Sequence, residues 1–137
     1  MSLKKHKIFL FLLFVSFLGK AQDCVLDIGG EHYKTIERIF QLNEEQKQNV
    51  EEWRAQLSIE EKNINEEAAK LFETHPQDTP EELMVLGQKY NVLKQRLLDI
   101  TVKYDKKLIG FFNEKQKERY AELCKAAARK PLIKGVK

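Results

Sequence analysis

The sequence predicts an all-α protein, with a long antiparallel helical hairpin between short N- and C-terminal helices. Two long segments repeat apolar residues at helical spacing. Short sequences of the helix-capping type precede these segments and the last expected helix. The 137 residues are 42% hydrophobic and 33% charged, with only 6 Gly and 3 Pro. This length and composition suit a single domain built from long, solvent-facing helices.

Residues 1–21 have the pattern of a secretory signal peptide. Basic residues precede an apolar run over residues 8–18, and small residues at Gly19 and Ala21 favour cleavage after Ala21. The apolar run is shorter than the about 20 residues that span a bilayer, so we favour cleavage over a retained anchor. Asp23 stands where a lipoprotein signal requires a small residue, which disfavours lipidation of Cys24.

The expected product is a periplasmic protein without a transmembrane anchor, with one domain over residues 22–130 and a basic tail over 131–137. Cleavage removes four of the 24 basic residues and none of the 21 acidic ones, which leaves a net charge of −1. Residues 125–137 carry five basic residues and no acidic one. These cations complement the negative end of a last helix, and they can also contact anionic lipid or an acidic partner. An exported protein of this kind is not expected to bind nucleic acid.

Two cysteines, Cys24 and Cys124, remain after cleavage. Outside the cytoplasm, an even number of cysteines is typical of disulfide formation. A bond within the chain would close a loop of about 100 residues and stabilise the fold by up to about 4–5 kcal/mol in the chain-entropy model. A bond between two protomers and a pair of free thiols are the alternatives.

The first half of the chain predicts an arm and two helices. Gly29-Gly30 ends an arm or turn, and residues 31–40 predict a short helix. A long helix is expected from Asn43 to about Glu73, because Asn43 and Gln46 form a capping box. Apolar residues recur in it every seven positions, at Val50, Leu57, Ile64 and Leu71.

A turn over residues 74–79 leads to a second long helix. Thr79 supplies a cap, Pro80 a favourable first position and Glu82 the capping-box partner. Apolar residues spaced by three and four then predict a coiled-coil seam that ends near Gly110. The seam comprises Leu83, Leu86, Tyr90, Leu93, Leu97, Ile100, Tyr104 and Phe111, with Lys107 as its single break. Two long helices with a short connection are expected to fold back as an antiparallel hairpin.

Asn113 and Gln116 repeat the capping box and predict a last helix that stops before Pro131. With the preceding apolar residue, the two boxes are Leu42-Asn43-Glu44-Glu45-Gln46 and Phe112-Asn113-Glu114-Lys115-Gln116. This pair of motifs, on either side of a long hairpin in a small exported protein, resembles the paired L-T-x-x-Q motifs of the Spy/CpxP family of periplasmic proteins. The resemblance covers roughly residues 31–130.

The chain departs from the family pattern at three motif positions. Asn replaces Thr in both motifs, and Phe112 replaces Leu in the second. Asn caps a helix as well as Thr, so the structural role is carried over, whereas a role that needs a hydroxyl is not.

The resemblance implies a hairpin that dimerises into a thin, curved cradle. It also implies an ATP-independent chaperone for unfolded or stress-damaged envelope proteins. The alternatives within the family are an adaptor that binds the periplasmic sensor domain of an envelope-stress kinase, and a metal-responsive binding protein. We take the chaperone as the main hypothesis and expect a homodimer.

The sequence adds a physical reason to expect an open apolar surface. The second long helix carries more apolar residues than one inward stripe holds, and a second line of them lies about 100° to 150° around the helix from the seam. The client-binding candidates are Met84, Leu98, Val102 and Ile109, together with Trp53 and Phe72 of the first long helix. A dimer interface and the terminal helices could instead cover all of them. Charged neighbours such as Lys103, Asp105 and Lys106 are expected to hold a client weakly or to face solvent.

Catalysis has little support. The chain has no Gly-rich loop, and the histidines of the expected mature protein have no Ser or Cys partner at motif spacing. Adjacent Glu pairs point about 100° apart on a helix and do not share a site. Two metal-binding alternatives, His32 with Asp27 and Glu31, or Cys24 with Cys124, lack the spacing of zinc ligands. We therefore expect neither an enzyme nor a metal or other cofactor.

Overall fold

The computed structural model describes residues 24–129, which contain helices and no strand. The helices are α2 (Tyr33–Phe40), α3 (Glu44–Thr74), α4 (Pro80–Gly110) and α5 (Glu114–Arg129). The expected all-α class is therefore confirmed for this part of the chain. The predicted signal peptide and the predicted tail over 131–137 lie outside the described residues.

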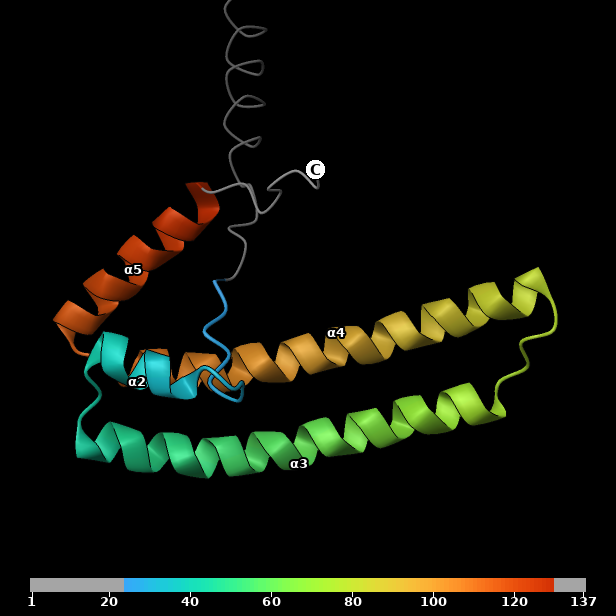
Figure 1. Cartoon of the computed structure of the whole chain (residues 1–137), viewed down its shortest axis with the longest axis horizontal. Coiled ribbons are helices and arrows are strands. Elements are labelled where there is room, and N and C mark those ends of the chain that lie inside the picture. Colours follow the sequence, from blue (N-terminus) through green and yellow to red (C-terminus); the bar gives the residue numbers. More distant parts are fainter. Residues whose placement is uncertain (1–23, 130–137) are drawn as a thin grey trace, which may run out of the picture.

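The two long helices, α3 and α4, lie side by side and run in opposite directions, joined by the loop over residues 75–79 (Figure 1). Each has 31 residues, which corresponds to about 46 Å at a rise of 1.5 Å per residue. Three residues of the seven-residue repeat, Val50, Leu57 and Ile64, are buried, as expected for a helix that packs along one stripe.

The inward stripe of α4 agrees with the predicted seam at Leu86, Leu93 and Tyr104 and differs from it elsewhere. The buried apolar residues of α4 are Leu86, Leu93, Tyr104 and Leu108, whereas Leu83, Tyr90 and Phe111 are exposed. Leu83 lies in the first turn of α4, next to the loop, and is 51% exposed. Phe111 is the C-cap residue of α4, where the chain turns away from the helix. Leu108 is fully buried and takes the inward position four residues after Tyr104.

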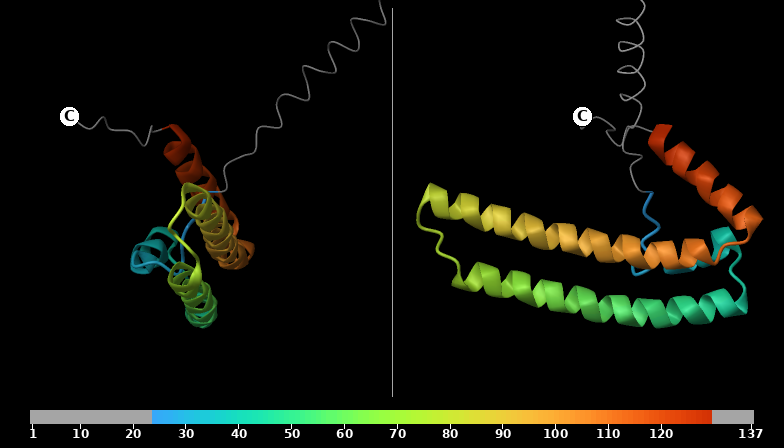
Figure 2. Two further views of the ribbon diagram at one scale, coloured as in Figure 1. Left: turned by 90° about the vertical axis from the view of Figure 1, so that its right-hand side faces the viewer. Right: turned by 180° about the vertical axis from the view of Figure 1, so that it is seen from behind.

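The arm over residues 24–32 and α2 cover one flank of the α3/α4 pair, at the end remote from the 75–79 loop (Figure 2). Ile28 in the arm and Tyr33 in α2 are buried in the core. The arm approaches α3 closely at Gly29, where an added Cβ would lie 2.6 Å from Cδ2 of Leu57. Only glycine avoids this clash without a shift of Leu57.

This third layer divides the helical pair into two parts. The covered half comprises residues 44–61 and 100–110, and the open half comprises residues 62–74 and 80–99. The last helix, α5, leaves the covered end at an angle to the pair (Figure 1), with Tyr120 and Leu123 packed against the core. No helix within residues 24–129 is long and apolar enough to cross a membrane.

Candidate binding surface

The two predicted motifs meet at the covered end, where their glutamines form a reciprocal hydrogen-bonded pair. Nε2 of Gln46 donates to Oε1 of Gln116 at 2.8 Å, and Nε2 of Gln116 donates to Oε1 of Gln46 at 3.0 Å. Gln46 also donates to the carbonyl of Phe111, and Gln116 to that of Phe40. Both glutamines are buried. Because an unpaired buried amide costs about 1–3 kcal/mol, this junction holds the starts of α3 and α5 in one arrangement.

Each glutamine also completes its own capping box. Oδ1 of Asn43 accepts the backbone N–H of Gln46, and Oε1 of Gln46 accepts the backbone N–H of Asn43. Asn113 and Gln116 repeat the same exchange. Asn thus caps both helices through its side-chain carbonyl oxygen.

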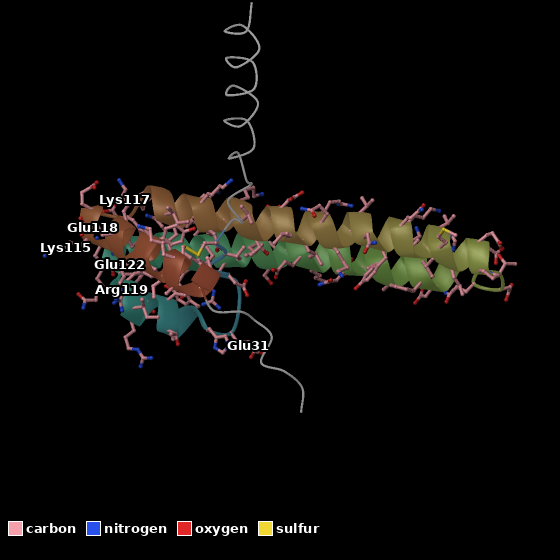
Figure 3. All side chains as sticks on the ribbon, turned by 90° about the horizontal axis from the view of Figure 1, so that it is seen from above. Glu31, Lys115, Lys117, Glu118, Arg119 and Glu122 are labelled. Carbon is pink, nitrogen blue, oxygen red and sulfur yellow. A yellow bond between two sulfur atoms is a disulfide. The ribbon has the colours of Figure 1, made fainter. Side chains whose placement is uncertain are left out.

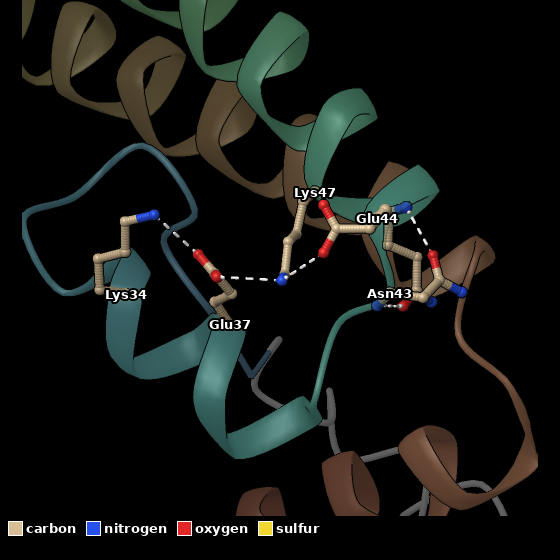
Figure 4. A network of polar contacts seen from close by, with 6 residues as sticks. Lys34, Glu37, Asn43, Glu44 and Lys47 are labelled. Carbon is tan, nitrogen blue, oxygen red and sulfur yellow. Dashed lines mark hydrogen bonds and ion pairs between the residues drawn. The ribbon is translucent and has the colours of Figure 1, made fainter.

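Apolar and charged contacts join α2 to both motifs. Leu42 and Phe112, the residues before the two caps, are buried, and Phe112 stacks on Phe40 with ring centroids 4.7 Å apart. Nζ of Lys47 in α3 lies 3.6 Å from a carboxylate oxygen of Glu37 in α2 (Figure 4). The described contacts of the motif residues are therefore internal to the fold, and the motifs close the base of the helical pair.

A buried carboxylate anchors the arm to α4. Oδ2 of Asp105 accepts the backbone N–H groups of Leu26 and Asp27 at 2.7 and 2.9 Å, and Oδ1 accepts that of Ile28 at 3.0 Å. Asp105 is only 2% exposed. Burial raises its pKa, and the three N–H donors oppose this shift. The expectation that Asp105 belongs to a solvent-facing or client-holding charged set is wrong, because the arm folds over this side of α4.

Cys24 and Cys124 form a disulfide within the chain, with Cα atoms 5.7 Å apart (Figure 3). The bond joins the start of the arm to α5. The Tyr120 hydroxyl donates to the carbonyl of Cys24 at 2.7 Å, so α5 contacts the arm at two positions. On its solvent-exposed side α5 carries charged residues, several of which are labelled in Figure 3.

A groove of about 740 Å³ lies between the arm and α4. It is lined by Val25, Gln95, Leu98, Asp99, Val102, Lys103 and Lys106. Val25 and Leu98 are 40% and 47% exposed, and Val102 is partly exposed. The groove therefore combines apolar walls with charges of both signs and is open to solvent.

Three of the six predicted client-binding candidates are exposed. Met84 and Leu98 lie on α4 and Phe72 on α3, and all three present large apolar side chains to solvent. Phe72 packs edge-to-face on Tyr90 across the pair, with ring centroids 5.1 Å apart. A fourth candidate, Val102, lines the groove beside Leu98.

The other two candidates, Trp53 and Ile109, pack against the core. Trp53 also meets Phe111 edge-to-face, with ring centroids 5.6 Å apart, and Nζ of Lys107 lies 5.8 Å from its ring. Both side chains are partly buried, whereas Met84 is 62% exposed.

Sequence reasoning did not identify Val25 as a groove residue. Its place depends on the path of the arm, which is set by the contact of distant Asp105 with the arm backbone. The apolar character of Val25 next to Cys24 was the only local signal.

Ion pairs link the two long helices outside the core. The guanidinium of Arg96 donates to both carboxylate oxygens of Glu67, at 2.6 and 3.0 Å. Glu60 accepts from Lys103 at 2.7 Å and from the Tyr104 hydroxyl at 2.6 Å. These hydrogen bonds hold the pKa of Glu60 and that of Glu67 below their usual range.

The two metal-binding alternatives do not form sites within residues 24–129. His32, Asp27 and Glu31 do not come together as a metal-binding group. The sulfur atoms of Cys24 and Cys124 are bonded to each other.

Comparison of the chain with protein-family models, curated proteins and solved structures finds no match.

Proposed function

We propose that this protein is an exported, ATP-independent chaperone-like protein that binds unfolded or stress-damaged envelope proteins. One observation carries the proposal: seven large apolar side chains are exposed on several sides of the open half of the helical pair. These are Phe72, Leu83, Met84, Val85, Tyr90, Val92 and Leu98. Single exposed apolar residues are ordinary, whereas a set gathered on one segment is typical of an interaction surface.

The two-layer architecture explains this exposure. Each long helix buries only the stripe that faces the other, and in the covered half α2 and the arm add a third layer. None of the described helices provides such a layer over the open half. Apolar side chains outside the inward stripe therefore stay in solvent, as Met84 and Val92 do at 62% and 61% exposure.

Charged residues interleave with this apolar surface. Asp99, Lys103 and Lys106 line the same groove as Leu98 and Val102. A shallow surface of this kind can hold unrelated unfolded segments through several weak contacts. Binding stays weak because ordering an unfolded client costs conformational entropy. Release then requires neither ATP hydrolysis nor a catalytic step.

We place the protein in the periplasm as a homodimer whose hairpins form a cradle, as the family resemblance implies. Val85 and Val92 support this arrangement. They lie roughly 120° to 140° around α4 from Leu98 on a helical projection. A second copy that covers Val85 and Val92 would therefore leave the groove available for a client.

Aggregation assays test the proposal. Protein purified after export should suppress aggregation of several unrelated unfolded proteins at near-stoichiometric amounts without ATP. The double substitution Leu98→Ser and Val102→Ser should remove most of this protection while the circular dichroism spectrum stays helical. Ile59→Ser is the matched control, since Ile59 is 63% exposed on α3 and lies outside the groove. This control should protect as well as the wild type.

The outcomes separate the hypotheses. Full protection by the double variant would exclude the groove as the client site. Absence of suppression by the wild type, with saturable binding to one sensor domain of a stress kinase, would replace the chaperone by the adaptor.

A further inference from the structure

We propose that the Cys24–Cys124 disulfide is a redox control on the groove, and that its reduction weakens client binding. This inference rests on the proposed function, because it concerns the regulation of the same surface. The observation behind it is that Val25, one wall of the groove, directly follows Cys24 in the arm.

The arm is held in two separate ways. Residues 26–28 are fastened to α4 by their backbone N–H groups, which donate to Asp105. Cys24 and Val25 lie beyond these bonds, and Cys24 is attached to α5 through the disulfide and the Tyr120 hydroxyl. Reduction removes the covalent attachment of Cys24 and keeps the Tyr120 hydrogen bond and the bonds of residues 26–28, so we expect the segment that contains the groove wall to be held less firmly.

The position of α5 depends on the same bond. Among the helices of residues 24–129, α3 and α4 pack along their length, whereas α5 diverges from them (Figure 2). α5 is fixed at its start by Gln116 in the motif junction and by the ring of Tyr120, 6.4 Å from that of Phe112. Cys124 lies further along the helix, so the disulfide restrains the second half of α5.

The two cysteine residues are partly exposed, and the reductant we propose is a dithiol, such as a protein with a Cys-x-x-Cys site. One reductant thiolate attacks a sulfur of the disulfide and forms a mixed disulfide, which the second reductant thiol resolves. In total the S–S bond breaks, two electrons and two protons reach this protein, and two thiols form. The reductant leaves with its own disulfide, and an oxidising compartment reverses the change.

In the oxidised protein the crosslink pre-organises the groove. Val25 is held beside Leu98 and Val102 before a client arrives. In the reduced protein this wall has to be ordered during binding, which lowers affinity. Loss of one apolar wall residue is expected to raise the Kd about three- to tenfold.

Fluorescence anisotropy with a labelled client measures this effect. The probe is a carboxymethylated globular protein, which stays unfolded in both redox conditions. The exported protein is titrated in its oxidised form and after reduction with a phosphine, and the reduced form should show the higher Kd. In the Leu98→Ser variant the two forms should bind equally weakly, because the groove is already lost. The double variant Cys24→Ser and Cys124→Ser should reproduce the reduced form without a reductant.

Hydrogen exchange supplies a readout that does not depend on a client. Reduction should accelerate exchange in residues 121–129 of α5 and leave the seam between α3 and α4 protected. Equal or tighter client binding by the reduced wild type would overturn the redox control and leave the chaperone proposal standing. Failure of both forms to bind any client would overturn the proposed function itself.

Discussion

The covered and open halves of the helical pair share one apolar repeat and differ in what surrounds it. In the covered half, Val50, Leu57 and Leu108 are fully buried beneath the arm and α2. In the open half, Ile64 and Leu86 are still buried between the helices, but their apolar neighbours face solvent. A single inward stripe is thus enough to pair two long helices. The third layer buries further apolar residues at the covered end, although Ile59, on a side of α3 that this layer does not reach, stays 63% exposed.

The polar groups of the two halves differ in the same way. At the covered end Gln46, Gln116 of α5 and Asp105 are buried and hydrogen-bonded. In the open half the pair of Glu67 and Arg96 is exposed. Buried polar networks specify one arrangement because any alternative leaves a group unpaired, whereas exposed ion pairs contribute little.

Truncation of one leucine in each half should show the difference between the two halves most clearly. Leu57→Ala should lower the free energy of unfolding by about 3–4 kcal/mol, because it leaves a cavity in a packed core. Leu83→Ala, at a position 51% exposed, should lower it by less than about 1 kcal/mol. Urea unfolding followed by circular dichroism measures both values. Equal losses would show that the two halves are packed alike.

Removal of the buried carboxylate should have the next largest effect. Asp105→Ala leaves three backbone N–H groups of the arm without their acceptor, which should cost about 2–3 kcal/mol of unfolding free energy. Asp99→Ala, six residues earlier on an exposed position of α4, should change it by less than about 0.5 kcal/mol. Arm amides should also exchange faster in Asp105→Ala alone.

The glutamine pair should behave as one unit. Gln46→Ala and Gln116→Ala should each cost about 1–2 kcal/mol, and the double variant should cost less than the sum by about 1 kcal/mol, because each change already leaves the other amide partly unpaired. A double-mutant cycle in urea measures this coupling. Additive losses would mean that the motifs cap their own helices independently.

The pH dependence of stability tests whether burial or the three N–H donors dominate the pKa of Asp105. Burial raises the pKa of Asp105, so the native state retains this proton at a higher pH than the unfolded chain does. The resulting stabilisation is complete below the unfolded pKa of about 3.9 and is lost as the pH rises through the native value. The stability difference between the wild type and Asp105→Asn should therefore fall as the pH is raised through this interval. A rising difference would show that the three N–H donors outweigh burial.

The smallest effect is expected at the exposed ion pair. Glu67→Gln removes one partner of Arg96 in the open half, where solvent screens the charges. The thermal unfolding midpoint should stay unchanged within error in buffers of low and high salt. A clear loss at low salt only would assign this pair a structural role.

Local signals predicted much of the fold. The boxes at Asn43, Thr79 and Asn113 lie directly before the observed helices, since a cap depends on residues only three positions apart. The seven-residue repeat of α3 correctly marked Val50, Leu57 and Ile64 as inward residues.

What the sequence did not reveal depends on contacts between distant segments. The buried state of Asp105 follows from backbone groups 77 to 79 residues away, and no local pattern distinguishes this residue from its charged neighbours. The same holds for Val25, and for the meeting of Gln46 with Gln116. Of the candidate surface, Leu98 and Val102 followed from helical spacing alone, while the arm that completes the groove did not.

Within the described residues, the arm, α2 and α5 pack against the helical pair at one end only. The motif junction and the disulfide-linked arm clamp its base, whereas the 75–79 loop forms a free tip (Figure 1). Under a sideways force, displacement grows with the distance from the fixed end. Leu83 and Met84 near the tip would therefore move further than Leu57. The tip, where Leu83 and Met84 are exposed, is therefore expected to change shape more readily than the base, and the proposed binding of differently shaped clients would use this property.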